Sequence, residues 1–158
     1  MGVIDGPETA SRTRCLFEKS GLRFTRQREV LYESLAATKS HPTADELFQS
    51  VRAIESGLSL ATVYNTLEAL IEAGLVRRIP CAIGSGACRF DADTSHHVHI
   101  ATGDGRVHDV PEDLSRRLLS GIPQEVVSDL ERRLGVRIDG LNVQLLASRQ
   151  ANWPGAQG

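Results

Sequence analysis

The interpretation of this chain begins at Ser59-Leu60-Ala61-Thr62-Val63-Tyr64-Asn65-Thr66-Leu67. Ser59 is a favourable N-cap residue, and Gly74 can end the helix that follows it. Apolar side chains at positions 63, 67, 70 and 71 fall on one stripe of such a helix. The polar side chains of Thr62 and Asn65 fall away from that stripe, and Tyr64 lies at its edge. The stretch therefore predicts an amphipathic helix over residues 60–73.

Three further helices are predicted upstream, over about residues 8–20, 25–37 and 43–57. The third begins at Thr43, which has the spacing of a capping box with Glu46. Its apolar residues recur with helical periodicity as far as position 54, and a glycine at position 57 is expected to end it. The first half of the chain is therefore predicted to be a small helical cluster.

The periodicity changes after the fourth predicted helix. Residues 75–79 and 87–90 have the pattern of two strands, and Gly84-Ser85-Gly86 supplies the turn between them. Helices followed by a hairpin are the element order of a winged helix-turn-helix domain. In that domain the last helix enters the major groove of DNA and the hairpin lies along the backbone.

The second half of the chain reads as strand, strand, helix, strand. The strands are predicted over residues 97–101, 107–110 and 136–147. A helical region begins at Pro111 and is interrupted at Gly121-Ile122-Pro123, which favours two helices. A domain of this size exposes apolar faces unless it pairs with another copy.

These patterns give an α+β fold with two domains. Residues 1–90 are expected to form the winged-helix DNA-binding domain. Residues 91–150 are expected to form a small C-terminal α/β domain for dimerisation and metal binding, and residues 151–158 a disordered tail. Pairing with another copy would cover the apolar faces that the second domain exposes.

Composition narrows the class of protein. The chain has 158 residues, of which 41% are hydrophobic and 24% charged, as in soluble globular proteins. No apolar run is long enough to cross a bilayer, and the N-terminus lacks the pattern of a signal peptide, so we expect a cytoplasmic protein without membrane contact. The formal net charge of −2 argues against general affinity for nucleic acid.

Any affinity for DNA must therefore come from local clusters of basic residues. Arginines gather at positions 12 and 14, at 23, 26 and 28, and at 77 and 78. The cluster of Arg23, Arg26 and Arg28 adjoins the predicted winged helix, which favours contact with phosphates. The alternative is a solvated helix face, the usual role of a run of charges.

Three of the five histidines lie within Ser95-His96-His97-Val98-His99-Ile100. In an extended strand His97 and His99 share one face, and two imidazoles on one face make half of a site for a divalent transition metal. Asp91 and Asp109 flank this run, and His41 lies far upstream. The alternative is an exposed polar loop whose histidines have no such role.

Linked motifs along residues 16–147 resemble the ferric uptake regulator (Fur) family of metal-dependent repressors. The motifs are listed here in chain order: Gly21-Leu22-Arg23-Phe24-Thr25-Arg26-Gln27-Arg28, His41-Pro42-Thr43-Ala44-Asp45-Glu46-Leu47, the helix quoted above, Arg89-Phe90-Asp91, and the histidine run with Asp109. The resemblance implies a homodimer that represses transcription when a divalent metal fixes the geometry of its DNA-binding domains. It implies that double-stranded operator DNA is the partner.

The resemblance also implies the site residues. The metal ligands would be His41, Asp91, His97, His99 and Asp109, a set that suits Fe²⁺, Mn²⁺ or Zn²⁺. Residues assigned to DNA contact are Arg23, Arg28, Thr62, Tyr64 and Asn65. A ring at the start of a groove-entering helix can meet thymine methyls, although Tyr64 could instead pack against the core.

The chain departs from the family in its cysteines. Cys15, Cys81 and Cys88 form no Cys-x-x-Cys pair, so a structural zinc held by four cysteines of one chain is excluded by count. Cys81 and Cys88 lie on either side of the predicted turn, either as small strand residues or as a redox pair. His96 matches one ligand of a second metal site found in some members, but other ligands expected there are missing.

Asn65 and Asp109 resemble the peroxide-sensing branch of the family, in which bound Fe²⁺ leads to oxidation of a ligand histidine. A metallohydrolase is a different alternative, but it needs an open coordination position, and five protein ligands would fill the site. No nucleophile motif is visible, so we expect no enzyme. A third alternative is an interaction module that needs no metal.

Overall fold

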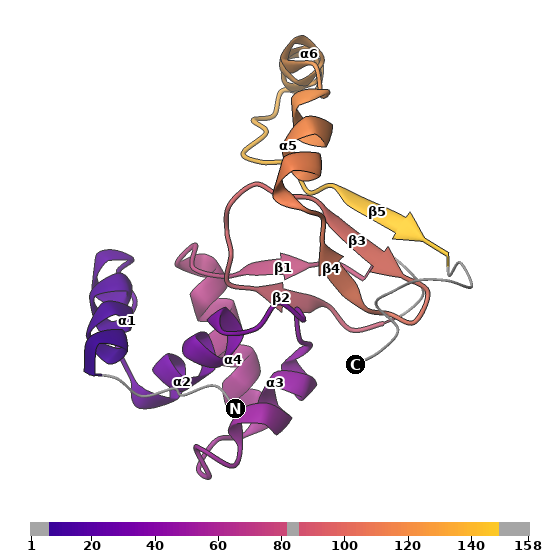
Figure 1. Cartoon of the computed structure of the whole chain (residues 1–158). Helices are drawn as coiled ribbons and strands as arrows, with labels where there is room; N and C mark the ends of the chain where they lie inside the picture. The colour runs from indigo at the N-terminus through magenta and orange to yellow at the C-terminus, as the bar shows by residue number, and fades with distance from the viewer. Residues whose placement is uncertain (1–6, 82–85, 149–158) are drawn as a thin grey trace. The chain divides into compact units, whose positions relative to one another are not determined.

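The computed structural model of the chain describes residues 7–81 and 86–148, which Figure 1 draws in colour. They belong to two compact units, residues 1–94 and 95–158. Residues 89–91 belong to the first unit, because they pair with one of its strands. The predicted tail over residues 151–158 lies outside the described residues.

The N-terminal unit contains the four predicted helices. Their bounds are α1 Pro7–Lys19, α2 Arg26–Ala36, α3 Ala44–Val51 and α4 Leu60–Glu72. Each of the last three begins at a side-chain hydroxyl that accepts a hydrogen bond from a backbone N–H three residues later. The hydroxyls belong to Thr25, Thr43 and Ser59. Thr43 and Glu46 form the predicted capping box, which satisfies two N–H groups that a helix start leaves without partners.

Helix α3 is shorter than the periodicity predicted. It ends at Val51 rather than near Gly57, and the carbonyl of Val51 accepts from the backbone N–H groups of both Ile54 and Glu55. This tight turn rotates Ile54 out of the core, and its side chain is exposed. The predicted helix was too long because Ile54 continues its apolar periodicity although this side chain is exposed.

A hairpin of β1 Arg77–Ile79 and β2 Arg89–Asp91 follows α4. The strands pair antiparallel, with Arg77 opposite Asp91. On its other side β2 contacts the segment before α3, where the N–H of Phe90 donates to the carbonyl of Pro42 at 3.1 Å. Thus β2 ties the hairpin to the start of α3.

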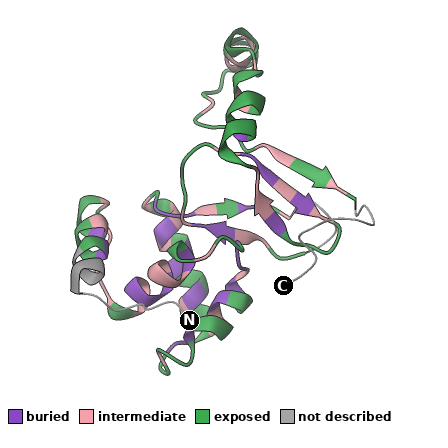
Figure 2. Cartoon of the chain, in the orientation of Figure 1, coloured by how far each residue is buried: buried purple, intermediate pink, exposed green. Residues whose placement is uncertain are grey.

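The core of this unit lies between the helices and β2, as the purple segments of Figure 2 show. Its fully buried members include Phe17, Leu31, Leu35, Leu47, Val51, Val63, Leu67 and Leu70. Phe90 brings β2 into the same cluster. Each such side chain stabilises the fold by about 1.5–3 kcal/mol, so α4 is held with its apolar stripe inward.

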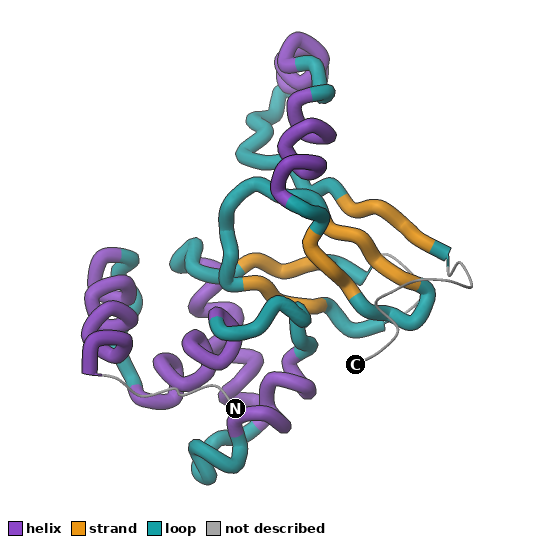
Figure 3. The backbone as a smooth tube through the Cα atoms, in the orientation of Figure 1, coloured by secondary structure: helices purple, strands orange, loops and turns teal. Residues whose placement is uncertain are grey.

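The C-terminal unit combines a small sheet with two helices (Figure 3). Its sheet has the order β4-β3-β5, with β3 His99–Thr102, β4 Val107–Asp109 and β5 Gln144–Ala147. Strand β3 pairs antiparallel with β4 and parallel with β5. The predicted interruption separates α5 Glu112–Ser120 from α6 Gln124–Leu134.

Two predicted strands of this unit are shorter in the structure. The first begins at His99 instead of His97, and the last covers only residues 144–147 of the predicted 136–147. Residues 136–143 form no regular element, and the N–H of Ile138 donates to the Glu131 side chain. The apolar residues around β5 are exposed, so no alternation of buried apolar and exposed polar residues marks where this strand begins and ends.

Apolar side chains of the C-terminal unit are mostly exposed. Of the eleven large apolar residues exposed among those described, nine lie in this unit, and α6 has no buried residue. Leu114 and Leu118 of α5, together with Leu145 of β5, line a hollow of about 680 Å³. Within the described ranges, every helix is too short or too polar to cross a membrane.

Candidate metal-binding and DNA-binding residues

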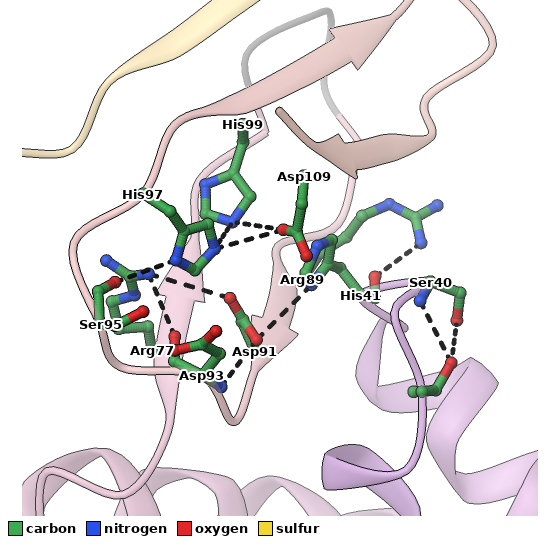
Figure 4. Close-up of polar contacts among 11 residues, drawn as sticks. Ser40, His41, Arg77, Arg89, Asp91, Asp93, Ser95, His97, His99 and Asp109 are labelled. Atoms are coloured by element: carbon green, nitrogen blue, oxygen red, sulfur yellow. Dashed lines mark hydrogen bonds and ion pairs between the residues drawn. The ribbon is translucent and has the colours of Figure 1, made fainter. Parts of the chain in front are cut away.

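Three predicted ligands converge in the C-terminal unit. The Nε2 atoms of His97 and His99 lie 2.9 Å apart, and they lie 3.2 and 3.6 Å from Oδ1 of Asp109 (Figure 4). The register places His99 directly opposite Asp109. His97 lies before β3, so the two histidines do not share a strand face as the sequence predicted. Their side chains nevertheless meet.

The spacing of these three atoms suits a transition metal. Zinc binds nitrogen and oxygen at about 2.0–2.2 Å, so two donors on one ion lie roughly 3.0–3.4 Å apart for angles between 90° and tetrahedral. The three distances between donor atoms of His97, His99 and Asp109 lie close to that range. The cluster can thus supply two imidazole nitrogens and one carboxylate oxygen to one cation.

The surroundings of His97 orient its ring for this role. Its Nδ1 lies 2.9 Å from the carbonyl oxygen of Ser95, which can only accept, so Nδ1 must carry a proton. The other ring nitrogen, Nε2, faces His99 and Asp109. Such a partner on the second ring nitrogen is typical of histidines that bind metals.

The other two predicted ligands lie together in the N-terminal unit. Nδ1 of buried His41 is 3.8 Å from Oδ1 of Asp91, which is also buried. The Asp91 carboxylate accepts the N–H of Asp93 at 2.8 Å and lies 3.9 Å from the Arg77 guanidinium. The Asp91 carboxylate thus lies beside both the His41 ring and a guanidinium.

His41 has an unusual backbone. With φ of 47° it is, across the described stretches, the single residue other than glycine with a positive φ. That region is costly for residues with a Cβ, and a residue before proline normally takes an extended conformation. Surrounding contacts must therefore hold His41 in place, as is common at functional positions.

The three arginines before and within α2 have different surroundings. Arg28 donates to the carbonyl of Arg23 at 2.7 Å, and Arg26 forms an ion pair with Glu29. The side chain of Arg23 is exposed. Arg28 thus stabilises the loop before the helix, whereas the Arg23 side chain extends into solvent.

The predicted DNA residues of α4 also differ. Thr62 lies within the helix cap, where its hydroxyl is 2.8 Å from that of Ser59, and Asn65 is exposed. The hydroxyl of half-exposed Tyr64 donates to Oδ2 of Asp45 in α3 at 3.3 Å. The negative charge of Asp45 raises the pKa of Tyr64 above its usual value of 10.0. Tyr64 therefore packs across the surface of α3 rather than in the core.

Asp45 and Arg89 were missed at the sequence level. Both lie within motifs quoted above, but only the packing shows that Asp45 reaches Tyr64 and that Arg89 reaches the carbonyl of His41. The signal available for Arg89 was its position two residues before Asp91, on the same face of a strand. Distant contacts of this kind leave no periodic pattern in a sequence.

The described strands include neither Cys81 nor Cys88. Strand β1 ends at Ile79 and β2 begins at Arg89, so the pairing register does not reach either cysteine. Within the described residues, no disulfide joins Cys81 to Cys88.

Family comparison agrees with this architecture. The ferric uptake regulator family model matches residues 19–132. The chain therefore belongs to the ferric uptake regulator family, as its motifs predicted. The matched range includes α2 to α5 and nearly all of α6, together with all five predicted ligands.

The chain also resembles individual members. It is 37% identical over 81 residues to a peroxide-responsive repressor of Staphylococcus saprophyticus, a match that covers 51% of this chain and 53% of that protein. Over 93 residues it is 37% identical to the peroxide operon regulator of Bacillus subtilis, covering 58% of this chain and 63% of the relative. The chain spans about half the length of the first curated relatives it matches.

Solved structures share the fold. The ferric uptake regulator of Pseudomonas aeruginosa with manganese is 25% identical and superposes with a TM-score of 0.64, over 87% of this chain and 97% of that one. The peroxide stress regulator of Campylobacter jejuni is 23% identical, with a TM-score of 0.61 over 90% and 97%. The α+β fold with a winged helix and a small C-terminal unit is thus confirmed.

The positive φ of His41 leads to a stability prediction. In the presence of a chelator, His41→Gly should be about 1 kcal/mol more stable than His41→Ala, because only alanine carries the cost of a Cβ in the left-handed region. Urea unfolding of both variants measures the difference. The same pair of substitutions at exposed Ser40 should give the opposite order, and equal stability of the two His41 variants would contradict a strained backbone.

A second prediction concerns the bond between Tyr64 and Asp45. In a Tyr32→Phe background, Tyr64 is the single remaining tyrosine, and Asp45→Asn should lower its pKa toward the usual value by removing the nearby negative charge. Absorbance of the phenolate during a pH titration measures this change. Glu72→Gln, at the far end of α4, is the matched control, and a pKa unaffected by Asp45→Asn would refute the contact in solution.

Proposed function

We propose that this protein is a metal-responsive, sequence-specific transcriptional repressor that acts in the cytoplasm as a homodimer on double-stranded operator DNA. The observation that carries this proposal is the convergence of His97, His99 and Asp109 in a chain whose other unit is a winged helix. Family membership supports it. The role is that of a regulator rather than an enzyme.

One cation is proposed to take ligands from both units: His97, His99 and Asp109 from one, His41 and Asp91 from the other. A cation with ligands on both units binds the joined arrangement more tightly than the separate one, so it shifts the population toward the joined form. If that form presents the two winged helices of a dimer at the spacing of an operator, metal binding and DNA binding become linked.

The ligand chemistry favours Fe²⁺, Mn²⁺ or Zn²⁺. Three imidazoles and two carboxylates contain no thiolate, which lowers any preference for copper. The chain has three cysteines, too few for a zinc held by four cysteines of one chain. The related ferric uptake regulator of Pseudomonas aeruginosa, whose structure contains manganese, supports the same group of metals.

On the DNA side, α4 is proposed to enter the major groove. Its exposed Tyr64 and Asn65 would meet base edges, while Arg23 would contact the phosphate backbone. Thr62 and Arg28 are proposed to act through the loops and caps they stabilise as well as by direct contact.

Dimerisation is proposed to bury the exposed apolar face of the C-terminal unit. Nine large apolar residues of this unit are exposed, and three of them, Leu114, Leu118 and Leu145, line one hollow. A contiguous apolar surface of this kind marks an interaction site. A second copy of the chain covers them with the same residues, as in a twofold symmetric dimer.

A peroxide-sensing role is the second candidate. The relatives that are 37% identical are named for their response to peroxide, and this supports oxidation of a ligand histidine when Fe²⁺ is bound. Peroxide treatment of the Fe²⁺-loaded protein should then add one oxygen atom to the peptide with His97 and His99, as measured by mass spectrometry. The Zn²⁺-loaded protein should remain unmodified.

The main test is DNA binding with and without metal. A preferred DNA site is first selected from random duplexes with Mn²⁺ present, and its affinity is then measured by fluorescence anisotropy in Mn²⁺ and in a chelator. His97→Ala should weaken the Mn²⁺-dependent affinity by roughly tenfold or more, because it removes one ligand. His96→Ala, which alters an exposed neighbour, should bind as the wild type does. Equal affinity of His97→Ala and wild type at every Mn²⁺ concentration would refute the metal switch.

The dimer proposal has a separate test by light scattering. After exhaustive chelation the mass should remain that of a dimer, because packing of apolar side chains holds the copies together. Leu118→Asp should give monomers, whereas Ile54→Asp, at an exposed apolar position of the other unit, should not. A monomer after chelation that dimerises again with Zn²⁺ would show that a metal holds the interface.

A further inference from the structure

The strained backbone at His41 is held by contacts from one strand. Nη1 of Arg89 in β2 donates to the carbonyl oxygen of His41 at 2.9 Å. The next two residues of the segment are also bound to β2, since Phe90 N–H donates to the Pro42 carbonyl and Thr43 forms a β-bridge with Arg89. His41 thus lies at the end of a short stretch fixed to β2.

The same arginine nitrogen is fixed in turn by α3. It lies 2.9 Å from Oε2 of Glu46, and that oxygen also accepts the backbone N–H of Thr43 at 2.9 Å. Glu46 is the N3 residue of the capping box, so the start of α3 holds its position. The Arg89 side chain is 15% exposed and that of Glu46 is 54% exposed, so the hydrogen-bond geometry rather than the charge of the pair fixes the guanidinium.

Arg89 also shares its strand face with a second proposed ligand. Residues two apart on a strand project to the same side, so Arg89 and Asp91 leave β2 together. One holds the carbonyl of His41, and the other lies 3.8 Å from its imidazole. Strand β2 therefore fixes both the backbone of His41 and the partner of its ring.

From this geometry we infer that Arg89 is a positioning residue for metal binding: it keeps the backbone of His41 left-handed so that the imidazole lies beside Asp91. This inference rests on the proposed function, in which His41 and Asp91 are ligands. Without the bond from Arg89, His41 would relax toward the extended conformation usual before proline, which would redirect its side chain. Removal of a residue that orients a metal ligand commonly lowers metal affinity ten- to a hundredfold.

The test titrates the full chain with Mn²⁺ alone, using calorimetry. Arg89→Met keeps an apolar stem and removes the donors, and it should raise the Kd for Mn²⁺ by roughly tenfold or more. Arg89→Lys retains a cation that can donate to both oxygens, so it should recover most of the affinity. Arg78→Met, in the partner strand and paired with Glu68, should leave the Kd unchanged.

A merely structural role is distinguished by two further measurements. Phe17→Leu weakens the core away from the hairpin, and it should lower thermal stability without changing the Kd for Mn²⁺. In the metal-free protein, the NMR signal of the His41 ring should shift in Arg89→Met but not in Phe17→Leu. An unshifted ring signal, or a Kd change in Phe17→Leu as large as in Arg89→Met, would overturn the positioning role.

Failure of the inference differs from failure of the proposed function. If wild type binds Mn²⁺ and Arg89→Met binds it equally well, only the role of Arg89 is overturned. If wild type binds no Mn²⁺, the metal switch is refuted and the positioning role in metal binding falls with it.

Discussion

The contact between β2 and the segment before α3 is the interaction on which the N-terminal unit depends. Phe90 lies in the core, its N–H binds the carbonyl of Pro42, and its neighbour Arg89 binds that of His41. One strand of three residues thereby joins the hairpin, the capped start of α3 and a left-handed histidine. Because interiors are closely packed, a shift of this strand would be felt in all three.

The start of α3 also connects the proposed metal ligands with the proposed DNA surface. Glu46 binds Arg89 on one side, while Asp45, the preceding residue, accepts the hydroxyl of Tyr64 in α4. A continuous set of contacts within one unit therefore connects His41 with Tyr64. Such contacts make coupling physically possible, and its strength is a free energy that must be measured.

Much of the fold could be predicted because its signals are local. Thr25, Thr43 and Ser59 cap helices as expected, and the break at residues 121–123 separates α5 from α6. Errors arose where tertiary packing overrides local pattern. Ile54 continued a helical period but is exposed after a tight turn, and the final strand covers only four residues of a longer apolar stretch.

The sequence by itself determined the family, the order of elements and the ligand types, because capping, periodicity and motif spacing are properties of neighbouring residues. Only the tertiary structure decided that His97 meets His99 from outside the strand and that Arg89 holds His41. It also showed that Tyr64 is bound to Asp45. These contacts join residues brought together by folding, and no spacing along the chain encodes the directions in which their side chains point.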